Sequence, residues 1–586
     1  MSVLGYHGQY LRIDLSSRKS EVVALAPGSM RHHIGGSGLG THILLNETPG
    51  QVDPLGEEAP LIFVFSPLVG SPLTTSAKFA VMAKSPLTLR INDSLSSSAF
   101  AIAGKNTGYD AIVIVGIAEE PTCLVIDDGD VQFYEANDAW GTSSTQAAEI
   151  LESKLGSGFQ FASIGPAGEK LVRYATVSHD TRHAGRGGLG AVMGSKRLKA
   201  VAVRGNRRVQ FAQPDKLLAY SKQLSQESLG PATVKYRELG TVSNLLTFNR
   251  LGTLPTRNFQ QGSFEAAEVL APESLATTVE RTRASCAACT IGCEHIFRMP
   301  NQSQGVRLEY ENLFALGPLC GISDPNAILA ASARCDELGI DTISAGATIA
   351  FAMECAERGL LDADIEFGDA DGLLALIDQI GQSDGLGQLL AQGTRAMSKT
   401  IGGGSEDFAP HVKGLEIPGY EPRALQTMAL GFAVGARGAD HNRSGAYQVD
   451  FSESVDRMNL EDDSVPLAID TENESTIMDS LILCKFLRGV FSDRMASMAE
   501  MLNLVTGWDV DSNELAVTAD RIVTAKKRYN IEQGWTPAED ALPKRFYQEE
   551  LPEGASSGAI LDEQQLQRLV RLYNTSRGWS EDGWLL

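Results

Sequence analysis

The residue pattern of this chain changes near residues 204–215, and that change restricts its fold more than any other feature. Before this segment, apolar residues form short, β-branched runs separated by glycines, as strands are. After it, apolar residues recur at helical spacing over longer stretches. No repeat of fixed period is visible. We therefore expect an α+β multidomain protein with a β-rich first part and a mainly α-helical remainder.

Individual elements follow from the same patterns. The predicted strands are 10–15, 61–65, 78–83, 111–115, 123–127 and 131–134. The last two are joined by Asp127-Asp128-Gly129-Asp130, which is a good hairpin turn. The predicted helices are 327–339, 343–359 and 513–529. Gly339 and Gly359 stand where helix C-terminal caps belong.

Charge and hydropathy exclude several classes of protein. The net charge of −23 would repel phosphate backbones and anionic lipid, so nucleic acid and membrane surfaces are poor partners. The longest apolar runs, such as 61–65 and 111–115, are far shorter than the roughly 20 residues that span a bilayer. The N-terminus lacks the basic and apolar regions of a secretory signal. We expect a cytoplasmic protein without membrane insertion.

Three of the eight cysteines, Cys286, Cys289 and Cys293, form a C-x2-C-x3-C pattern. In a reducing compartment, clustered cysteines more often hold metal than form disulfides. Thiolates at this spacing can bind zinc or an iron–sulfur cluster, and three buried thiols are the structural alternative. The spacing alone leaves the fourth ligand open among Cys320, Cys335, Cys355 and Cys484.

Two glycine-rich segments, 34–44 and 183–200, could approach a ligand closely with their backbones. Free N–H groups at such turns bind phosphate. Neither segment fits a dinucleotide fingerprint, and tight turns at sheet edges explain the first one equally well. The second is the stronger candidate because three cations flank its glycines, namely Arg182, Arg186 and Lys196.

Several segments, taken together and in order, resemble the tungsten-dependent aldehyde:ferredoxin oxidoreductase family. They are GRGGLGAVMGSKRLKA (185–200), the triple cysteine, LEYENL (308–313), DELGID (336–341), KGLEIPGYEPR (413–423), ARGADH (436–441) and the region around Cys484. The resemblance covers essentially the whole chain. It implies a β-rich N-terminal domain as the base for a cofactor, over 1–208. It also implies an α-rich domain with the cluster cysteines over 209–412, and another with an active-site histidine over 413–586.

The cofactors implied by the resemblance are a [4Fe–4S] cluster and a tungsten or molybdenum ion held by two pterins. By this resemblance Cys286, Cys289, Cys293 and Cys484 ligate the cluster, which favours iron–sulfur over zinc. Magnesium bridging the pterin phosphates is a further implied ligand. Two motifs would grip the pterins, and their expected contacts are Asp336, Gly339, Asp341, Asp479 and Leu483. Further expected contacts with the cofactor are Lys78, Arg182, Arg186, Gly187 and Gly188.

The activity implied by the resemblance is oxidation of an aldehyde to a carboxylic acid, or the reverse. Glu311 would act as the general base and His441 as the donor to the aldehyde oxygen. Electrons would leave through the cluster to ferredoxin or a ferredoxin-like subunit. One alternative is a relative that acts on another carbonyl compound or a hydroxy acid. Another is a non-catalytic iron–sulfur electron-transfer protein, which would need far less chain than 586 residues.

The chain departs from the family pattern at several positions. Lys78 replaces an arginine, Leu95 begins the segment that replaces an Asn-x-Gly, and Ile482 replaces a glycine. Ser37 stands where many members carry arginine. A Glu-x-x-His motif that bridges some dimers through a metal is replaced by residues 330–333. Any homodimer of this chain would therefore lack that metal bridge.

Overall fold

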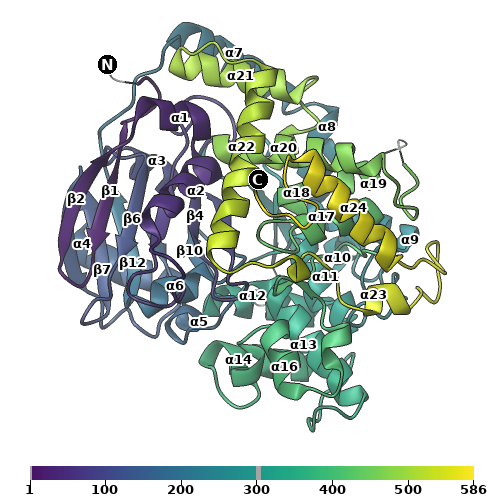
Figure 1. Cartoon of the computed structure of the whole chain (residues 1–586). Helices are drawn as coiled ribbons and strands as arrows, with labels where there is room; N and C mark the ends of the chain where they lie inside the picture. The colour runs from purple at the N-terminus through teal and green to yellow at the C-terminus, as the bar shows by residue number, and fades with distance from the viewer. Residues whose placement is uncertain (1–2, 299–304, 453–454) are drawn as a thin grey trace.

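The computed structural model describes residues 3–298, 305–452 and 455–586 (Figure 1). Strands gather in the first part of the chain, drawn from purple to blue on the left, and helices make up the rest. This arrangement confirms the predicted α+β class. The element-free segment between Arg204 and Pro214 coincides with the predicted change of pattern.

The first of two six-stranded sheets has the order β2-β1-β6-β3-β4-β5. All its neighbouring strands are antiparallel except β1 and β6. Its strands are β1 (Gln9–Asp14), β2 (Lys19–Ala24), β3 (Leu61–Val64), β4 (Lys78–Lys84), β5 (Ile91–Ser97) and β6 (Ala111–Val115). The completely buried β3 and β6 account for the uninterrupted apolar runs at 61–65 and 111–115.

The second six-stranded sheet has the order β11-β10-β9-β12-β7-β8. Its strands are β7 (Thr122–Asp127), β8 (Asp130–Glu135), β9 (Gln160–Ser163), β10 (Val177–His179), β11 (Arg182–Ala184) and β12 (Leu198–Arg204). Asp128 and Gly129 have φ of 47° and 92°, so both central residues of the β7–β8 hairpin take the left-handed conformation that such turns require. An apolar cluster that includes Phe63, Val81, Leu124 and Val201 joins the two sheets.

Helices of the first part cover these sheets. They are α1 (Pro27–His33), α2 (Gly36–Glu47), α3 (Ala99–Lys105), α4 (Ser144–Leu155), α5 (Pro166–Glu169) and α6 (Leu189–Ser195). Helix α2 packs on β3 and β4. It begins within the first glycine-rich segment, where a Cβ on Gly38 or Gly40 would clash with neighbouring atoms. Close packing therefore accounts for these glycines without a bound phosphate.

The remainder of the chain is helical. The helices are α7 (Pro214–Glu227), α8 (Pro231–Leu239), α9 (Asn244–Leu251), α10 (Pro272–Thr278), α11 (Tyr310–Leu316), α12 (Pro325–Leu338), α13 (Thr342–Glu357), α14 (Ala370–Gln382), α15 (Gly387–Leu390), α16 (Thr394–Ile401), α17 (Gln426–Val434), α18 (His441–Ser444), α19 (Tyr447–Asp450), α20 (Ser464–Leu481), α21 (Arg494–Thr506), α22 (Ser512–Glu532), α23 (Arg545–Gln548) and α24 (Glu563–Ser576). Helices α12, α13 and α22 confirm the three predicted helices. Short strands complete this part, namely β13 (Glu280–Ala284), β14 (Glu294–Arg298), β15 (Val306–Arg307), β16 (His411–Val412) and β17 (Leu415–Glu416).

One large apolar cluster runs through the helical part, from Val242 to Trp579. It includes residues on both sides of the boundary expected at 412. Separate cores therefore do not mark that boundary, and the division into 209–412 and 413–586 stays a prediction.

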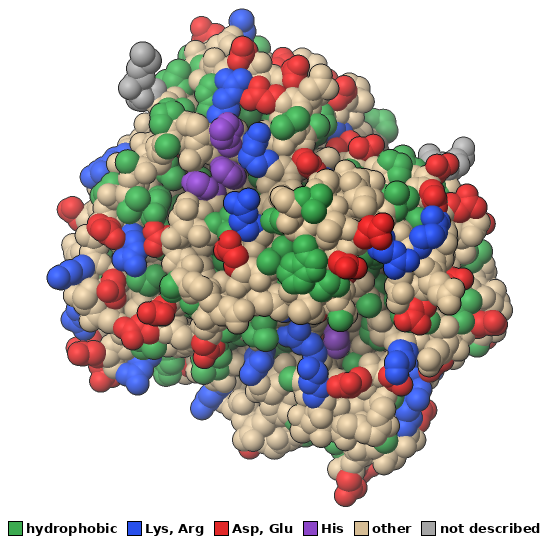
Figure 2. All heavy atoms as spheres, viewed as in Figure 1, with side chains coloured by type: hydrophobic (Ala, Val, Ile, Leu, Met, Phe, Trp, Pro, Cys, Tyr) green, Lys and Arg blue, Asp and Glu red, His purple; other side chains and the backbone are tan. Residues whose placement is uncertain are grey.

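The surface seen in Figure 2 carries acidic and basic side chains interspersed. The excess negative charge is thus not gathered in a single patch on this face. Within the described residues, no single helix is long and apolar enough to cross a bilayer. One bent pair, Tyr310–Cys320 with Pro325–Leu338, meets the length and composition criteria together. Most of its apolar side chains lie in the helical core.

Candidate active site between the sheets and the helices

A cavity of about 960 Å³ lies between the β-rich part and the helices. Strands β4, β5 and β11 contribute Lys78, Leu95 and His183 to its wall. Helical segments contribute Glu311, His441 and Cys484, among others. The cavity thus brings together residues from several of the segments in which the sequence predicts site residues, whereas the cysteines at 286–293 and the motif at 336–341 do not line it.

Glu311 and His441 face one another across this cavity. Glu311 lies in the first turn of α11, and the backbone N–H of Gly419 donates to its Oε2 at 3.1 Å. Its other oxygen, Oε1, is 3.6 Å from Nε2 of His441 and has no hydrogen-bond partner. Burial raises the pKa of Glu311 to about 7. A carboxyl group in this state can exchange a proton near neutral pH.

His441 is the first residue of the short helix α18, and its ring stacks on Tyr420 with the centroids 4.7 Å apart. Burial lowers the pKa of His441 to about 3, and the nearby Arg186 contributes in the same direction. The imidazole is therefore neutral. Its Nε2 is 2.8 Å from Nδ2 of Asn442, whose amide can donate to it. His441 then carries its proton on Nδ1, which has no partner among the described residues.

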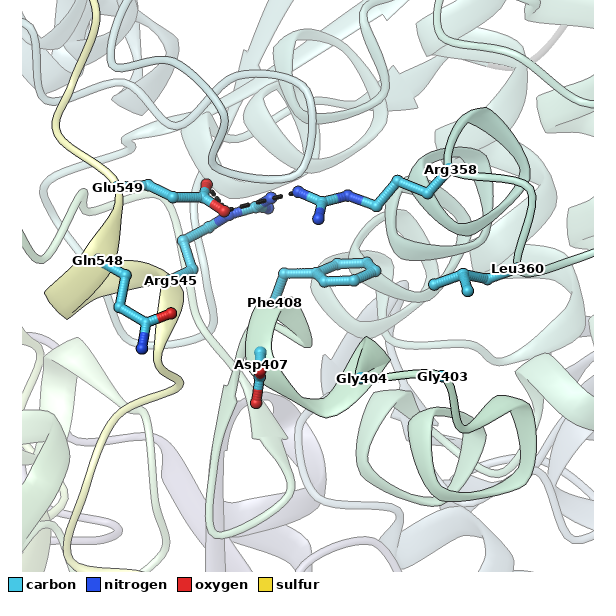
Figure 3. A pocket seen from close by; sticks show the side chains of 9 residues that line it. All are labelled: Arg358, Leu360, Gly403, Gly404, Asp407, Phe408, Arg545, Gln548 and Glu549. Atoms are coloured by element: carbon cyan, nitrogen blue, oxygen red, sulfur yellow. Dashed lines mark hydrogen bonds and ion pairs between the residues drawn. The ribbon is translucent and has the colours of Figure 1, made fainter.

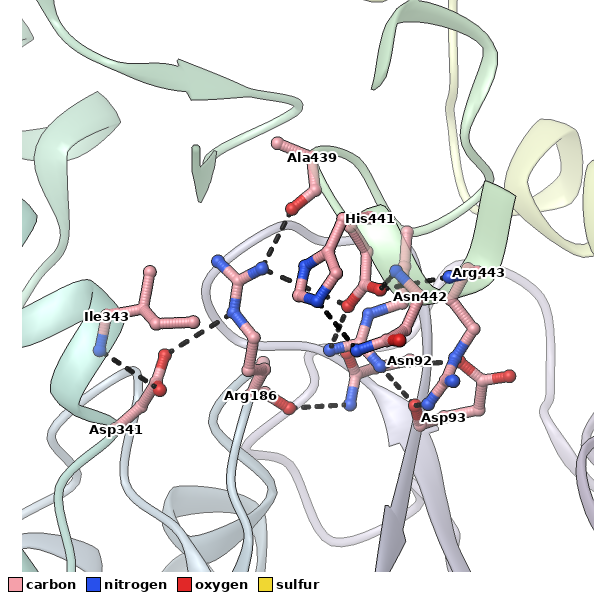
Figure 4. Close-up of polar contacts among 12 residues, drawn as sticks. Asn92, Asp93, Arg186, Asp341, Ile343, Ala439, His441, Asn442 and Arg443 are labelled. Atoms are coloured by element: carbon pink, nitrogen blue, oxygen red, sulfur yellow. Dashed lines mark hydrogen bonds and ion pairs between the residues drawn. The ribbon is translucent and has the colours of Figure 1, made fainter. Parts of the chain in front are cut away.

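Arg186 belongs to the glycine-rich segment 183–200 and contacts the chain next to His441 (Figure 4). Its guanidinium donates to the carbonyl of Ala439 at 2.8 Å and lies 3.6 Å from Asp341 and 3.9 Å from Asp440. The Nε atom of Arg186 has no hydrogen-bond partner. A cation with a spare donor at this position can bind an anionic ligand.

The glycines around Arg186 have different roles. Gly187 and Gly188 have φ of 89° and 77°, and an added Cβ would lie 2.0 Å from Asn92 Oδ1 and 1.9 Å from the Arg173 carbonyl. Both are therefore required by the fold itself. Gly185 lines the cavity, and an added Cβ there would meet no atom within 4 Å. Its open side leaves backbone accessible to a ligand, which makes Gly185 a candidate contact that the sequence did not single out.

The four cysteines predicted to hold the cluster come from two distant segments, the loop between β13 and β14 and the end of α20. A hydrogen bond from Cys289 lowers the pKa of Cys286 to about 5, and the charges of Arg182 and Lys78 act in the same direction. Burial raises the pKa of Cys293, and Cys484 adds to that effect, as it does for Cys289. The four sulfur atoms are therefore neighbours, and two cations lie beside them.

The remaining cysteines lie elsewhere. Cys320, Cys335 and Cys355 are buried in the helical core, and Cys123 is buried in the second sheet. In the described part of the chain, no three His, Cys, Asp or Glu side chains are placed to hold a single metal ion. A four-iron cluster holds its thiolates farther apart than one ion does. The assignment of the four thiols to an iron–sulfur cluster stays a prediction.

The first predicted pterin motif, 336–341, serves largely structural purposes. Asp336 lies 3.1 Å from His183 Nε2. Gly339 has φ of 76° at the end of α12, and an added Cβ would lie 3.1 Å from the backbone nitrogen of Gly165. Asp341 accepts hydrogen bonds from the first backbone N–H groups of α13. The motif thus joins two helices and packs them against the β-rich part.

The second predicted pterin motif, 479–484, lies on the cavity wall. Asp479 is 3.0 Å from Arg443 and 2.9 Å from Lys485, while Leu483 and Cys484 also line the cavity. Ile482 has φ of 59° and ends α20. This left-handed conformation is unusual for a β-branched residue, whereas the glycine expected here from the family resemblance would adopt it at little cost.

Sequence reasoning missed a network of buried charges beneath the cavity (Figure 4). Asp93 lies 2.9 Å from Arg443 and 2.8 Å from Lys526, and it also contacts Arg437. Arg437 and Arg443 flank His441 in the chain, so their spacing around the histidine was an available signal. Nothing in the sequence around Asp93 or Lys526 indicated that they meet.

A second cavity, of about 520 Å³, is less suited to chemistry (Figure 3). Arg545 lies 2.7 Å from Glu549, and Arg358 lies 2.7 Å from Glu354. Asp407 pairs with Lys544 at 3.0 Å. Within the described residues, none of its lining side chains has a buried polar atom without a partner.

The large cavity differs in this respect and fits an anionic, metal-bearing cofactor. Among the described residues, buried polar atoms without hydrogen-bond partners belong to side chains that line it, namely Arg186 Nε, Glu311 Oε1, Arg437 Nε and His441 Nδ1. Such atoms are costly unless a ligand or water satisfies them. Gly185 leaves room for a ligand to approach the backbone closely. Two cations, Arg182 and Lys78, lie beside the cluster cysteines.

Two family models together cover almost all of the sequence. Residues 10–205 match the N-terminal domain of aldehyde ferredoxin oxidoreductase, and residues 218–586 match its domains 2 and 3. The chain belongs to the aldehyde ferredoxin oxidoreductase family. This membership confirms the resemblance inferred from the motifs.

Individual members of the family agree along the whole chain. A tungsten-containing aldehyde ferredoxin oxidoreductase of Thermococcus kodakarensis is 35% identical over 99% of this chain and 97% of its own length. The corresponding protein of Pyrococcus furiosus is 34% identical with the same coverage. Among solved structures, the active-site complex BamBC of benzoyl coenzyme A reductase aligns with a TM-score of 0.83 and 23% identity. That alignment covers 99% of this chain and 96% of the other, and it supports the fold.

Proposed function

We propose that this family member oxidises an aldehyde to a carboxylic acid at a tungsten bis-pterin centre bound in the large cavity. The observation that carries the proposal is the largely buried Glu311, with a pKa of about 7, facing the neutral His441 in the cavity that Cys484 also lines. The net reaction joins R–CHO and water to give R–COOH, two protons and two electrons. The bound tungsten would accept the two electrons, and a [4Fe–4S] cluster would pass them on singly.

The protein's own residues would supply proton transfer and orientation. Ionised Glu311 would take a proton from water through Oε1, which has no hydrogen-bond donor among the described residues. His441 would donate its Nδ1–H to the aldehyde oxygen, where negative charge develops. The amide of Asn442 would fix the required tautomer, and Tyr420 would hold the ring in place by stacking.

Binding of the cofactors would rest on the residues around this pair. Cys286, Cys289, Cys293 and Cys484 would ligate the cluster, with Lys78 and Arg182 beside it. Arg186 and the open backbone of Gly185 would bind the pterins. Leu95 offers no side-chain oxygen, so magnesium at the pterin phosphates would depend on backbone carbonyls. Ferredoxin or a ferredoxin-like subunit would accept the electrons, and any homodimer would lack the metal bridge.

A substitution of the proposed base tests this assignment. Glu311→Gln keeps the size of the side chain but cannot accept a proton, so kcat should fall by about 10²–10⁴-fold. Glu309→Gln is the matched control. Glu309 caps α11 and accepts a hydrogen bond from Thr241 at 2.5 Å, so its loss should change kcat only a few-fold. Aldehyde oxidation is measured anaerobically with benzyl viologen as acceptor. A rate that falls with Glu309→Gln but not with Glu311→Gln would move the base to Glu309.

A further inference from the structure

One half of the large cavity has an aromatic wall. The ring of Phe248 packs against Tyr310, Tyr420 and Phe451, with centroids 4.9, 5.4 and 5.2 Å away. Tyr447 joins this group through Tyr420, at 5.1 Å. Because Tyr420 also stacks on His441, the aromatic wall begins at the proposed catalytic pair. This contact with His441 makes the aromatic wall a candidate surface for the substrate.

Arg488 is a cation on this aromatic side. It lines the cavity, and only 7% of its surface is exposed. Its guanidinium donates to Tyr447 Oη at 2.8 Å and to Ser475 Oγ at 2.9 Å, which are both neutral groups. Within the described residues, no carboxylate lies at ion-pair distance from it. A buried charge without a counter-ion is costly unless something compensates it.

Other buried arginines of this cavity have carboxylate partners. Arg186 faces Asp341 and Asp440, Arg437 faces Asp93 and Asp440, and Arg443 faces Asp93 and Asp479. The contrast singles out Arg488. No carboxylate among the described residues balances the charge of Arg488, whereas Arg186, which offers a spare N–H donor, already faces two carboxylates.

Arg488 is also held in a fixed position. The two side-chain bonds occupy two of the five N–H donors of a guanidinium. Its backbone N–H donates to Lys485 at 3.1 Å, and its carbonyl accepts from Arg494 at 3.1 Å. A planar cation that is already oriented loses little freedom when a carboxylate binds to its remaining donors.

We propose that Arg488 binds the carboxylate of a substrate that carries both an aldehyde and a carboxylate, that is, an oxo acid. This inference rests on the proposed aldehyde oxidation. The aldehyde would lie within reach of both Glu311 and the Nδ1 atom of His441, and the chain between the two functional groups would lie along Tyr420 and Tyr447. Arg488 would therefore determine specificity by recognising the end of the substrate that does not react.

Two aldehydes of similar size test the proposal, namely succinic semialdehyde, which carries a carboxylate, and pentanal, which does not. Replacing the cation by Arg488→Met should lower kcat/KM for succinic semialdehyde about 10–100-fold, mainly through KM. The value for pentanal should change less than about 3-fold. Arg488→Lys keeps the charge but not the planar fork, and it should recover part of the loss. Lys235→Met removes an exposed cation of the same cavity and should affect both aldehydes equally little.

Two outcomes would overturn the proposal. Equal losses for both aldehydes would mean that Arg488 acts on the reacting end or on the fold. Loss of tungsten from Arg488→Met would mean that its partner is a cofactor phosphate. Succinate binding to the holoenzyme, measured by calorimetry, gives a readout that does not need turnover. If the wild type oxidised neither aldehyde, the proposed function would fail. Weaker succinate binding to Arg488→Met would still support the anion site, and unchanged binding would refute it.

Discussion

Glu311 and His441 are both largely shielded from solvent, but burial shifts the pKa values of the two groups in opposite directions. It raises the pKa of the carboxyl to about 7 and lowers that of the imidazole to about 3. In both groups the neutral form is favoured, because a buried charge is costly. The same physical effect thus produces a base that titrates near neutrality and a donor that keeps its single proton across the working range of pH.

This difference predicts the pH dependence of catalysis. The proposed base must be ionised, so kcat/KM should fall as the pH drops through about 7 and level off above it. His441 should add no step in this range, because it is already neutral. The pH profile of aldehyde oxidation checks this, and Glu311→Gln should remove the step from the residual activity. A step near 7 that persists in Glu311→Gln would assign it to another group.

The proposed fourth cluster ligand can be tested against a cysteine of the core. Cys484 lies close enough to Cys289 and Cys293 to affect both thiols, whereas Cys335 is buried at the centre of the helical cluster. Cys484→Ala should therefore lose cluster iron, and Cys335→Ala should keep it. Iron is measured per chain on anaerobically purified protein. If Cys484→Ala retained all its iron, a residue other than Cys484 would be the fourth ligand.

At the scale of elements, the ends of α12 and α13 position the site. Both helices are followed by glycines with positive φ, at Gly339 and Gly359. These caps were predictable because glycine is the residue that adopts this conformation at little cost. The neighbours of each cap were not predictable, since they depend on tertiary packing. Gly339 lies against Gly165 of the β-rich part, while Gly359 has open space around its α-carbon.

The two glycines therefore provide a matched pair of substitutions. Gly359→Ala should cost about 1 kcal/mol, because the only penalty is the left-handed backbone. Gly339→Ala carries the same penalty and also pushes α12 away from Gly165, so it should cost about 2–4 kcal/mol. Gly339→Ala should also lower activity, because Asp341 comes two residues after Gly339 and lies 3.6 Å from Arg186. Calorimetric melting temperatures compare the two variants. Equal decreases in melting temperature would show that the contact with Gly165 does not contribute to stability.

At the scale of the whole molecule, the sequence predicted the order of strands and helices better than their assembly. Strands 61–65 and 111–115 were recognisable because they are buried on both faces and so entirely apolar. The Asp128-Gly129 turn between β7 and β8 was likewise recognisable from the sequence alone. The predicted site residues were recognisable through their motifs, and the cavity brings Glu311, His441 and Cys484 together. Their roles stay predictions.

The remaining features depend on contacts between segments that are distant in the chain. Asp93 meets Lys526 across more than four hundred residues, and Arg488 lacks a carboxylate only because of how α19 and α20 pack around it. No local sequence pattern predicts either arrangement. A missing partner in particular has no sequence signal, because it is a property of the folded environment.

The most direct test of the central claim is the metal content of the chain after anaerobic purification. The account predicts about four iron atoms and one tungsten or molybdenum per chain, because four thiols and a cofactor cavity lie side by side. Stoichiometric zinc without iron or tungsten would contradict it.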